Sequence, residues 1–167
     1  MVLNRNRIIR GDRMYKFAGI SVLAISLMGF STNALAQDFS FEAERKEIKS
    51  LGGIGATGTL YRGASWNGTY VAAFKGEEPT KGTYECVSTS QPPGIFRIHS
   101  ACTMTQAEGS FTSSWGCNPY NKDGSEMGCV AGLRGTSGRF ENLVGLANSH
   151  IKGNTSNGTG QFFKVGE

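Results

Sequence analysis

The sequence predicts an all-β domain, and three observations support this. Residues 37–167 hold 21 of the 24 glycines, because only Gly11, Gly19 and Gly29 precede them; 21 in 131 is about twice the usual share of roughly 7%. The excess follows no collagen repeat or long serine tract, so it indicates turns, bulges and curved strands. Short β-branched and aromatic runs alternate with turn residues, and no apolar stripe of helical spacing competes with them.

The N-terminal segment has the pattern of an export signal. An apolar run at 17–30 is followed by a small-residue cleavage site at Ala34–Ala36. The run is shorter than the roughly 20 residues that a membrane-spanning helix needs, which disfavours an anchor. We therefore expect a signal peptide at 1–36, a domain at 37–167 without an integral membrane segment, and a periplasmic or secreted mature protein. The basic residues of the signal are Arg5, Arg7, Arg10, Arg13 and Lys16.

Removing this leader neutralises the chain. The 17 basic residues fall by five and the 13 acidic residues fall by one, Asp12, which leaves 12 of each and a net charge of zero. A basic protein would suggest nucleic acid or an anionic membrane as a partner. We therefore expect no nucleic-acid partner.

The expected strands follow one another from residue 59 onward. Residues 59–66 and 69–75 flank Asn67-Gly68, the dipeptide that most favours a two-residue hairpin. The charged segment 41–50 fits either a short helix or a polar first strand. The other expected strands, which bring the total to about eight to ten, are 83–90, 95–105, 110–117, 127–133, 139–144, 146–151 and 161–165.

Four cysteines in an exported chain predict two disulfides rather than metal ligands. If hairpins turn near 92–94 and 122–123, the facing residues pair as Cys86–Cys102 and Cys117–Cys129. The rival pair Cys102–Cys117 is also nearly in register, across the turn at 108–109. No CxxC motif occurs, so a redox motif or a zinc ribbon is disfavoured, and we expect no metal.

The same register assigns side chains to the two faces of the sheet, because they alternate along a strand. Aromatic and apolar residues fall on the cysteine side, which we take as inward, whereas Glu85 and His99 fall on the other side. A solvated polar face explains those two residues better than an acid/base pair does. The inward residues that we expect to contact a ligand are Tyr84, Phe96, Ile98, Phe111 and Trp115, together with Asn142 from the later hairpin.

Common catalytic and cofactor motifs are missing or out of context. Gly53–Gly58 matches GxGxxG, but it follows a charged segment instead of an apolar strand, so we expect no dinucleotide and no other cofactor. Neither GxSxG nor HExxH occurs.

The C-terminal part resembles a family of known fold. Ala101–Gly109, Ser110–Trp115, Gly135–Gly145 and Gly158–Gly160 together resemble small exported bacterial proteins of the allene oxide cyclase barrel-like group. Plant dirigent proteins have a similar Gly-Thr-Gly-(Lys/Arg)-Phe element. The resemblance covers roughly the last 70 residues and implies a calycin-like antiparallel barrel of eight strands with an apolar interior. The chain departs from the pattern at Ser137, where the family has glycine, and in the turn at 106–108, where acidic residues are common.

Three functions suit such a barrel. The first is binding of a small apolar or aromatic molecule in the lumen. The second, implied by the resemblance, is a cofactor-free cyclase or isomerase similar to allene oxide cyclase, and whether the protein is an enzyme stays open. The third is a solid-cored structural or interaction protein of the cell envelope. An enzyme needs an inward polar group, for which the candidates are Ser88, Ser100, Ser113 and Asn142.

Overall fold

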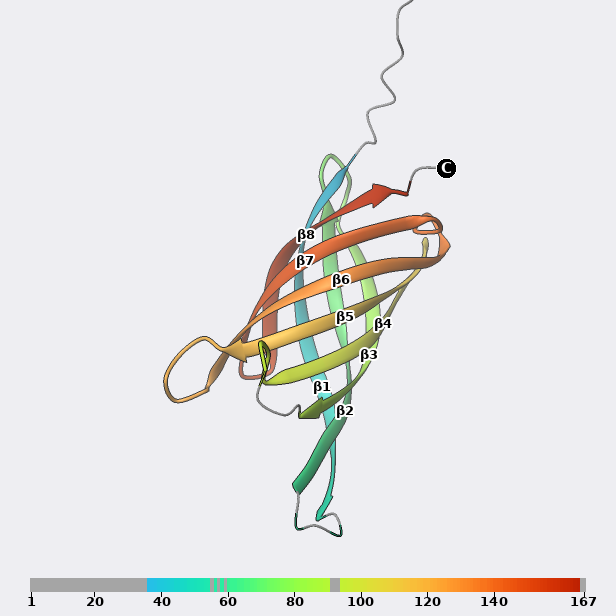
Figure 1. The fold of residues 1–167 in the computed structure, drawn as a ribbon. Helices are drawn as coiled ribbons and strands as arrows, with labels where there is room; N and C mark the ends of the chain where they lie inside the picture. Colours follow the sequence, from blue (N-terminus) through green and yellow to red (C-terminus); the bar gives the residue numbers. More distant parts are fainter. Residues whose placement is uncertain (1–35, 55, 57, 59, 91–93, 166–167) are drawn as a thin grey trace, which may run out of the picture. The chain divides into compact units, whose positions relative to one another are not determined.

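The structure is a computed structural model that describes residues 36–54, 56, 58, 60–90 and 94–165. The described chain is all-β and forms one closed antiparallel barrel in which each strand pairs with the next (Figure 1). Its strands are β1 (Gln37–Ile54), β2 (Leu60–Phe74), β3 (Thr80–Ser90), β4 (Ile98–Gln106), β5 (Gly109–Pro119), β6 (Glu126–Gly138), β7 (Leu143–Lys152) and β8 (Thr155–Lys164). The predicted antiparallel barrel is confirmed.

Closure comes from pairing of the first strand with the last. Gln37 of β1 lies opposite Phe162 of β8, and the ladder continues to Glu44 opposite Thr155. A closed ladder leaves no free edge along these residues for another chain to extend. The predicted signal peptide lies outside the described residues except for Ala36, and no helix within the described ranges is long and apolar enough to cross a membrane.

The charged segment 41–50 is a strand, and it contains a β-bulge. The register with β2 shifts between Arg45 and Glu47, so that one extra residue enters β1. Beyond this bulge β1 pairs with β2 alone, while β2 still pairs with β3 as far as Gly63. Past Gly63 the ends of β1 and β2 project from the barrel as a two-stranded ribbon (Figure 1). Arg45 is the last residue of β1 before the bulge.

The predicted hairpin at Asn67-Gly68 is wrong, because β2 runs through both residues. Asn67 pairs with Glu47 on one side and Glu85 on the other, as a central strand residue does. Glycine is needed at this position because a Cβ on Gly68 would collide with the Tyr84 ring, which lies over it. A glycine inside a strand often marks such a close approach.

The predicted strand at 139–144 is wrong as well. Residues 139–142 form the turn between β6 and β7, in which Asn142 adopts a positive φ of 62°. Phe140 leaves this turn and enters the barrel, where it is fully buried. Phe140 and Asn142 therefore do not lie on a strand.

The two disulfides have the preferred connectivity. Cys86 pairs with Cys102 across β3 and β4, and Cys117 pairs with Cys129 across β5 and β6. The rival pair Cys102–Cys117 does not form. All four cysteines are buried.

One end of the barrel interior is filled by phenylalanine rings, and we call it the phenylalanine end. Neighbouring ring centroids lie 5.0 to 6.0 Å apart, which is the range of favourable aromatic pairs. Arg139 covers this end, with its guanidinium 4.7 Å from the centroid of the Phe74 ring and paired with Glu77. The rings belong to Phe39, Phe74, Phe111, Phe140 and Phe162.

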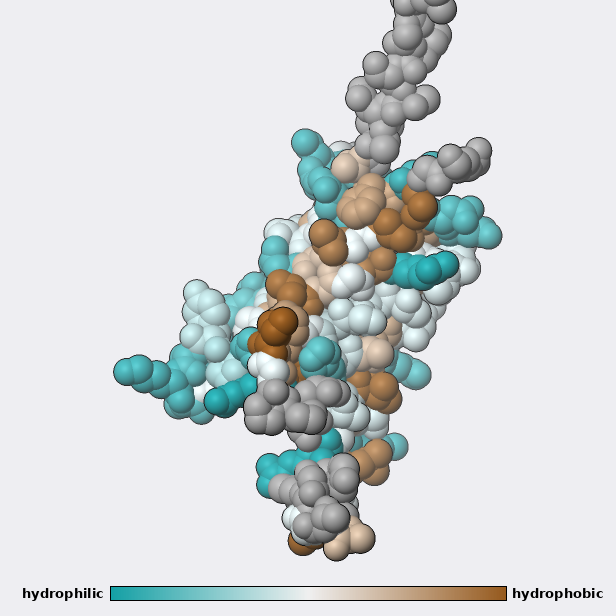
Figure 2. Space-filling view, in the orientation of Figure 1, coloured by the Kyte–Doolittle hydropathy of each residue, from teal (hydrophilic) through white to brown (hydrophobic). Residues whose placement is uncertain are grey.

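The outer surface mixes hydrophilic and hydrophobic side chains (Figure 2). Val87, Val130 and Leu146 are each more than half exposed on the outward side of their strands. Glu85 and His99 are exposed too, as expected for the polar face.

Candidate functional site

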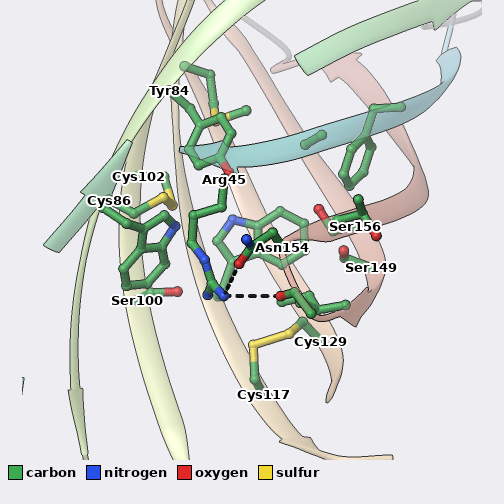
Figure 3. Close-up of a pocket in the computed structure, with 18 residues that line it drawn as sticks. Arg45, Tyr84, Cys86, Ser100, Cys102, Cys117, Cys129, Ser149, Asn154 and Ser156 are labelled. Carbon is green, nitrogen blue, oxygen red and sulfur yellow. Dashed lines mark hydrogen bonds between the residues drawn. A yellow bond between two sulfur atoms is a disulfide. The ribbon is translucent and has the colours of Figure 1, made fainter. Parts of the chain in front are cut away.

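The other end of the barrel holds a cavity of about 100 Å³, which we call the cystine cavity (Figure 3). Its walls combine aromatic rings, sulfur atoms and a few polar groups. The aromatic residues are Phe41, Trp66, Tyr84 and Trp115, the sulfur comes from both disulfides and Met104, and the polar side chains include Arg45, Ser100, Ser149, Asn154 and Ser156.

Strand alternation brings these residues together. On β5, for example, Ser113 and Trp115 face inward, while Ser114 and Gly116 face outward. The Trp115 indole Nε1 donates a hydrogen bond to Ser113 Oγ at 2.8 Å, and Ser113 is almost fully buried. This bond satisfies the indole and fixes the ring that forms one wall of the cavity.

Arg45 lies at the mouth of the cavity, on the same face of β1 as Phe41 and Ala43 (Figure 3). Its Nη2 donates to the carbonyl oxygen of Gly153 and to Oδ1 of Asn154, each at 3.0 Å. Both acceptors belong to the turn between β7 and β8, and both are neutral. Arg45 has the inward parity of Phe41 and Ala43, so strand alternation directs this cation toward the lumen just before the bulge.

Two features of Arg45 distinguish it from an ordinary surface cation. Its Nε is buried and has no hydrogen-bond partner among the described residues. Within the same part of the chain, no carboxylate forms an ion pair with its guanidinium. The cavity therefore combines apolar walls with an uncompensated positive charge at its mouth.

Tyr84 stands beside this charge as a neutral phenol. Burial raises the pKa of its hydroxyl, and the nearby Arg45 opposes that rise only in part. The hydroxyl is therefore a hydrogen-bond donor at neutral pH, and it belongs to the cavity wall.

A second buried polar group lies on the phenylalanine side of the cavity and is satisfied internally. The Tyr70 hydroxyl donates to Oε1 of Gln106 at 3.0 Å, and Nε2 of Gln106 donates to Oε2 of Glu108 at 2.9 Å. Burial, and secondarily the charge of Glu108, raises the pKa of Tyr70. None of these three residues lines the cystine cavity.

The residues predicted to contact a ligand fall in different places. Tyr84 and Trp115 line the cavity, whereas Phe111 is part of the phenylalanine end. Ile98 begins β4, is 37% exposed and lies outside the cavity lining. Of the polar candidates, Ser100 lines the cavity, and the hydroxyl oxygen of Ser113 accepts the hydrogen bond from the Trp115 indole.

The predicted inward positions of Phe96 and Asn142 are wrong. Phe96 precedes β4, and its ring covers Gly116 on the outside of β5, where a Cβ would collide with it. It also contacts His99 edge to face, with centroids 5.8 Å apart. Asn142 is exposed in the turn at the phenylalanine end. Strand alternation could not place either residue, because neither belongs to a strand.

Sequence reasoning missed Arg45, Trp66 and Met104. Met104 was recoverable, since it lies two residues from Cys102 on the inward face of β4. Trp66 was not, because the turn expected at Asn67-Gly68 interrupted the alternation along β2. Arg45 shares the inward parity of Phe41 and Ala43, but that alternation was not applied because the segment 41–50 fitted a short helix as well as a strand.

Fold and site together define a closed eight-stranded antiparallel barrel that is filled at one end and hollow at the other. A scan against protein-family models and a search of curated proteins found no match to this chain. The likeness to the allene oxide cyclase barrel-like group therefore stays a prediction. Within the described ranges, no three side chains of His, Cys, Asp or Glu cluster as metal ligands would.

Proposed function

We propose that this protein binds a small apolar or aromatic molecule in the cystine cavity, outside the cytoplasm. The observation that carries this proposal is the unequal filling of one continuous lumen. The phenylalanine end is packed, while the cystine end leaves about 100 Å³ lined by Trp66, Trp115 and sulfur. Ligand sites are typically such apolar concavities with a few converging polar groups.

The size of the cavity limits the ligand. A cavity of about 150 Å³ elsewhere admits benzene, so about 100 Å³ holds most of one ring and leaves the rest of the molecule at the open mouth. Met104 lies in the wall, and its flexible thioether can move to fit a ring.

The location in this proposal rests on the disulfides and on the leader. Two disulfides are consistent with an oxidising, extracytoplasmic compartment. Cleavage near Ala36 would release a periplasmic or secreted protein, and peptide mapping of the purified mature chain checks that site.

Thermal-shift and tryptophan-fluorescence titrations with hydrophobic and phenolic compounds test the binding. A binder at about 100 times its Kd stabilises the fold by about 2.7 kcal/mol and raises the melting temperature. Both tryptophans line the cavity, so their emission should change in the same titration.

A pair of neighbouring variants locates the site. Ser100→Leu adds bulk inside the cavity and should abolish the response, whereas Ala101→Leu adds the same bulk on the outer face of β4 and should keep it. The absence of any thermal or fluorescence response in the wild type, or its survival in a folded Ser100→Leu protein, would refute the proposal.

The alternative function, a cyclase or isomerase, uses the same cavity. Tyr84 and Ser100 put hydroxyl groups in its wall, where they could polarise a reactive substrate. Mass spectrometry of compounds recovered after incubation separates the two functions, because a binding protein returns its ligand unchanged.

A further inference from the structure

We infer that the ligand is an organic anion, a small aromatic carboxylate whose ring enters the cystine cavity and whose carboxylate is bound by Arg45. The inference rests on the proposed function, since it specifies the ligand of that same cavity. It is carried by the charge at the mouth, by the chemistry of the walls and by the depth of the lumen.

The charge at the mouth is single and uncompensated. Among the described residues that line the cavity, Arg45 is the only charged side chain. The two oxygens that accept its Nη2 hydrogen bonds satisfy donors but carry no net charge. Partial burial of an unpaired charge costs desolvation free energy. The protein supplies no anion to offset this cost at Arg45, and an anionic ligand would offset it.

Neighbouring carboxylates do not take this role. Glu44 precedes Arg45 in β1, but it is exposed and lies on the opposite side of the strand. Glu126, the carboxylate at the start of β6, is already paired with both His150 and Lys152, and no described carboxylate forms an ion pair with Arg45. The Arg45 guanidinium is therefore available to a ligand.

The number of charges favours a carboxylate over a phosphate. A carboxylate carries one negative charge, which one guanidinium matches in both charge and planar geometry. A phosphate monoester carries nearly two, and within the described residues no second cation lines the cavity to balance the excess. Ser149, Ser156 and Asn154 can supply the remaining hydrogen bonds.

The depth of the lumen favours a ring over a long alkyl chain. Below the cavity, Phe39, Phe111 and Phe162 close the lumen, and only a void of about 30 Å³ separates them from it. A fatty acid would therefore have to leave most of its chain outside. A flat ring instead fits a short cavity with indole walls and gains favourable contacts there.

Benzoate, its neutral isostere benzamide, and octanoate test the inference on the purified mature protein by calorimetry and tryptophan fluorescence. A charge-assisted hydrogen bond should make benzoate bind about 10- to 100-fold more tightly than benzamide. Octanoate, which has the same charge but no ring, should bind more weakly than benzoate.

Two arginine variants show which cation is responsible. Arg45→Gln should remove the preference for benzoate over benzamide, whereas Arg134→Gln, an exposed change on β6, should keep that preference. Arg45→Lys retains the positive charge but lacks the planar, forked donors of the guanidinium, so it should keep part of the preference for benzoate.

Each outcome has one meaning. If benzamide binds as tightly as benzoate, or octanoate binds best, the inference is wrong while the proposed function stands. If no ring compound binds at all, the proposed function itself fails. If Arg45→Gln does not fold, as circular dichroism would show, the wild-type preference and the Arg45→Lys result decide.

Discussion

The two ends of the barrel follow the same rule of alternation and reach opposite results. Along β8, the inward positions run from Phe162, which is fully buried, through Gly160 and Gly158 to Ser156 at the cystine cavity. One large inward side chain is thus followed by three small ones along a single strand. Strand number limits the width of a barrel, but the inward side chains decide whether it is solid or hollow.

The two ends also treat their arginines differently. Arg139 at the phenylalanine end stacks on Phe74 and pairs with Glu77, with Nη2 2.7 Å from Oε1. Arg45 at the cystine end bonds only to neutral oxygens. The first arginine completes a structural cap, whereas the second keeps its charge for a ligand, which is the core of our proposal.

The same substitution at each end should give the largest contrast in stability. Phe162→Ala removes a fully buried ring and should lower the free energy of unfolding by about 3–5 kcal/mol. Phe41→Ala removes a half-buried ring beside the cavity and should cost less than about 3 kcal/mol. Urea unfolding of the two variants measures the difference, and equal losses would mean that both ends are packed alike.

Replacing an inward glycine by alanine should destabilise the fold more than replacing an outward one. The difference should be smaller than that between the two phenylalanine variants. A Cβ on Gly158 would collide with the Phe41 ring and the Asn148 carbonyl, so Gly158→Ala should cost about 1–3 kcal/mol. Gly132→Ala on β6 meets nothing within 4 Å and should be neutral or slightly stabilising. Thermal unfolding compares them, and a tolerant Gly158 would show that the aromatic rings do not lie over the glycines.

Removing the Arg139–Glu77 ion pair at the phenylalanine end should have the smallest effect on stability, and that effect should depend on pH. The hydrogen bond from Arg139 lowers the pKa of Glu77, so the pair stabilises the fold above the ordinary carboxylate pKa and is lost as pH falls through the lowered value. Glu77→Gln should therefore lower the melting temperature slightly at pH 7 and not at all in acid well below about pH 4. A deficit that persists unchanged in acid would mean that the pair is not ionic.

Local patterns were sufficient to predict much of this molecule. The cysteine positions, combined with the turns expected near 92–94 and 122–123, ranked the disulfides correctly, because facing residues in a hairpin add to a constant. That register then placed Tyr84 and Trp115 inward, and both line the cavity. Alternation is a property of neighbouring residues, so a sequence displays it directly.

Features that depend on distant contacts could not be predicted in this way. Asn67-Gly68 resembled a turn in the sequence. The glycine is needed instead because the Tyr84 ring of the next strand lies over it, and that contact is remote in sequence. The bulge that follows Arg45 appears only in the pairing of β1 with β2, which the sequence of β1 does not display. Phe96 was placed inward by extending the alternation of β4 to residues before its first residue, Ile98.

The contrast between the two ends is tested most directly by NMR, because the chain has two tryptophans and both line the cystine cavity. The mature protein would be titrated with the aromatic compound that gives the largest thermal shift, with each indole signal assigned by a Trp→Phe variant. We expect both indole N–H signals to move, while the backbone amides of Phe111, Phe140 and Phe162 stay in place. Shifts centred on the phenylalanine end or on the outer surface around Phe96, with both indoles unmoved, would contradict the account.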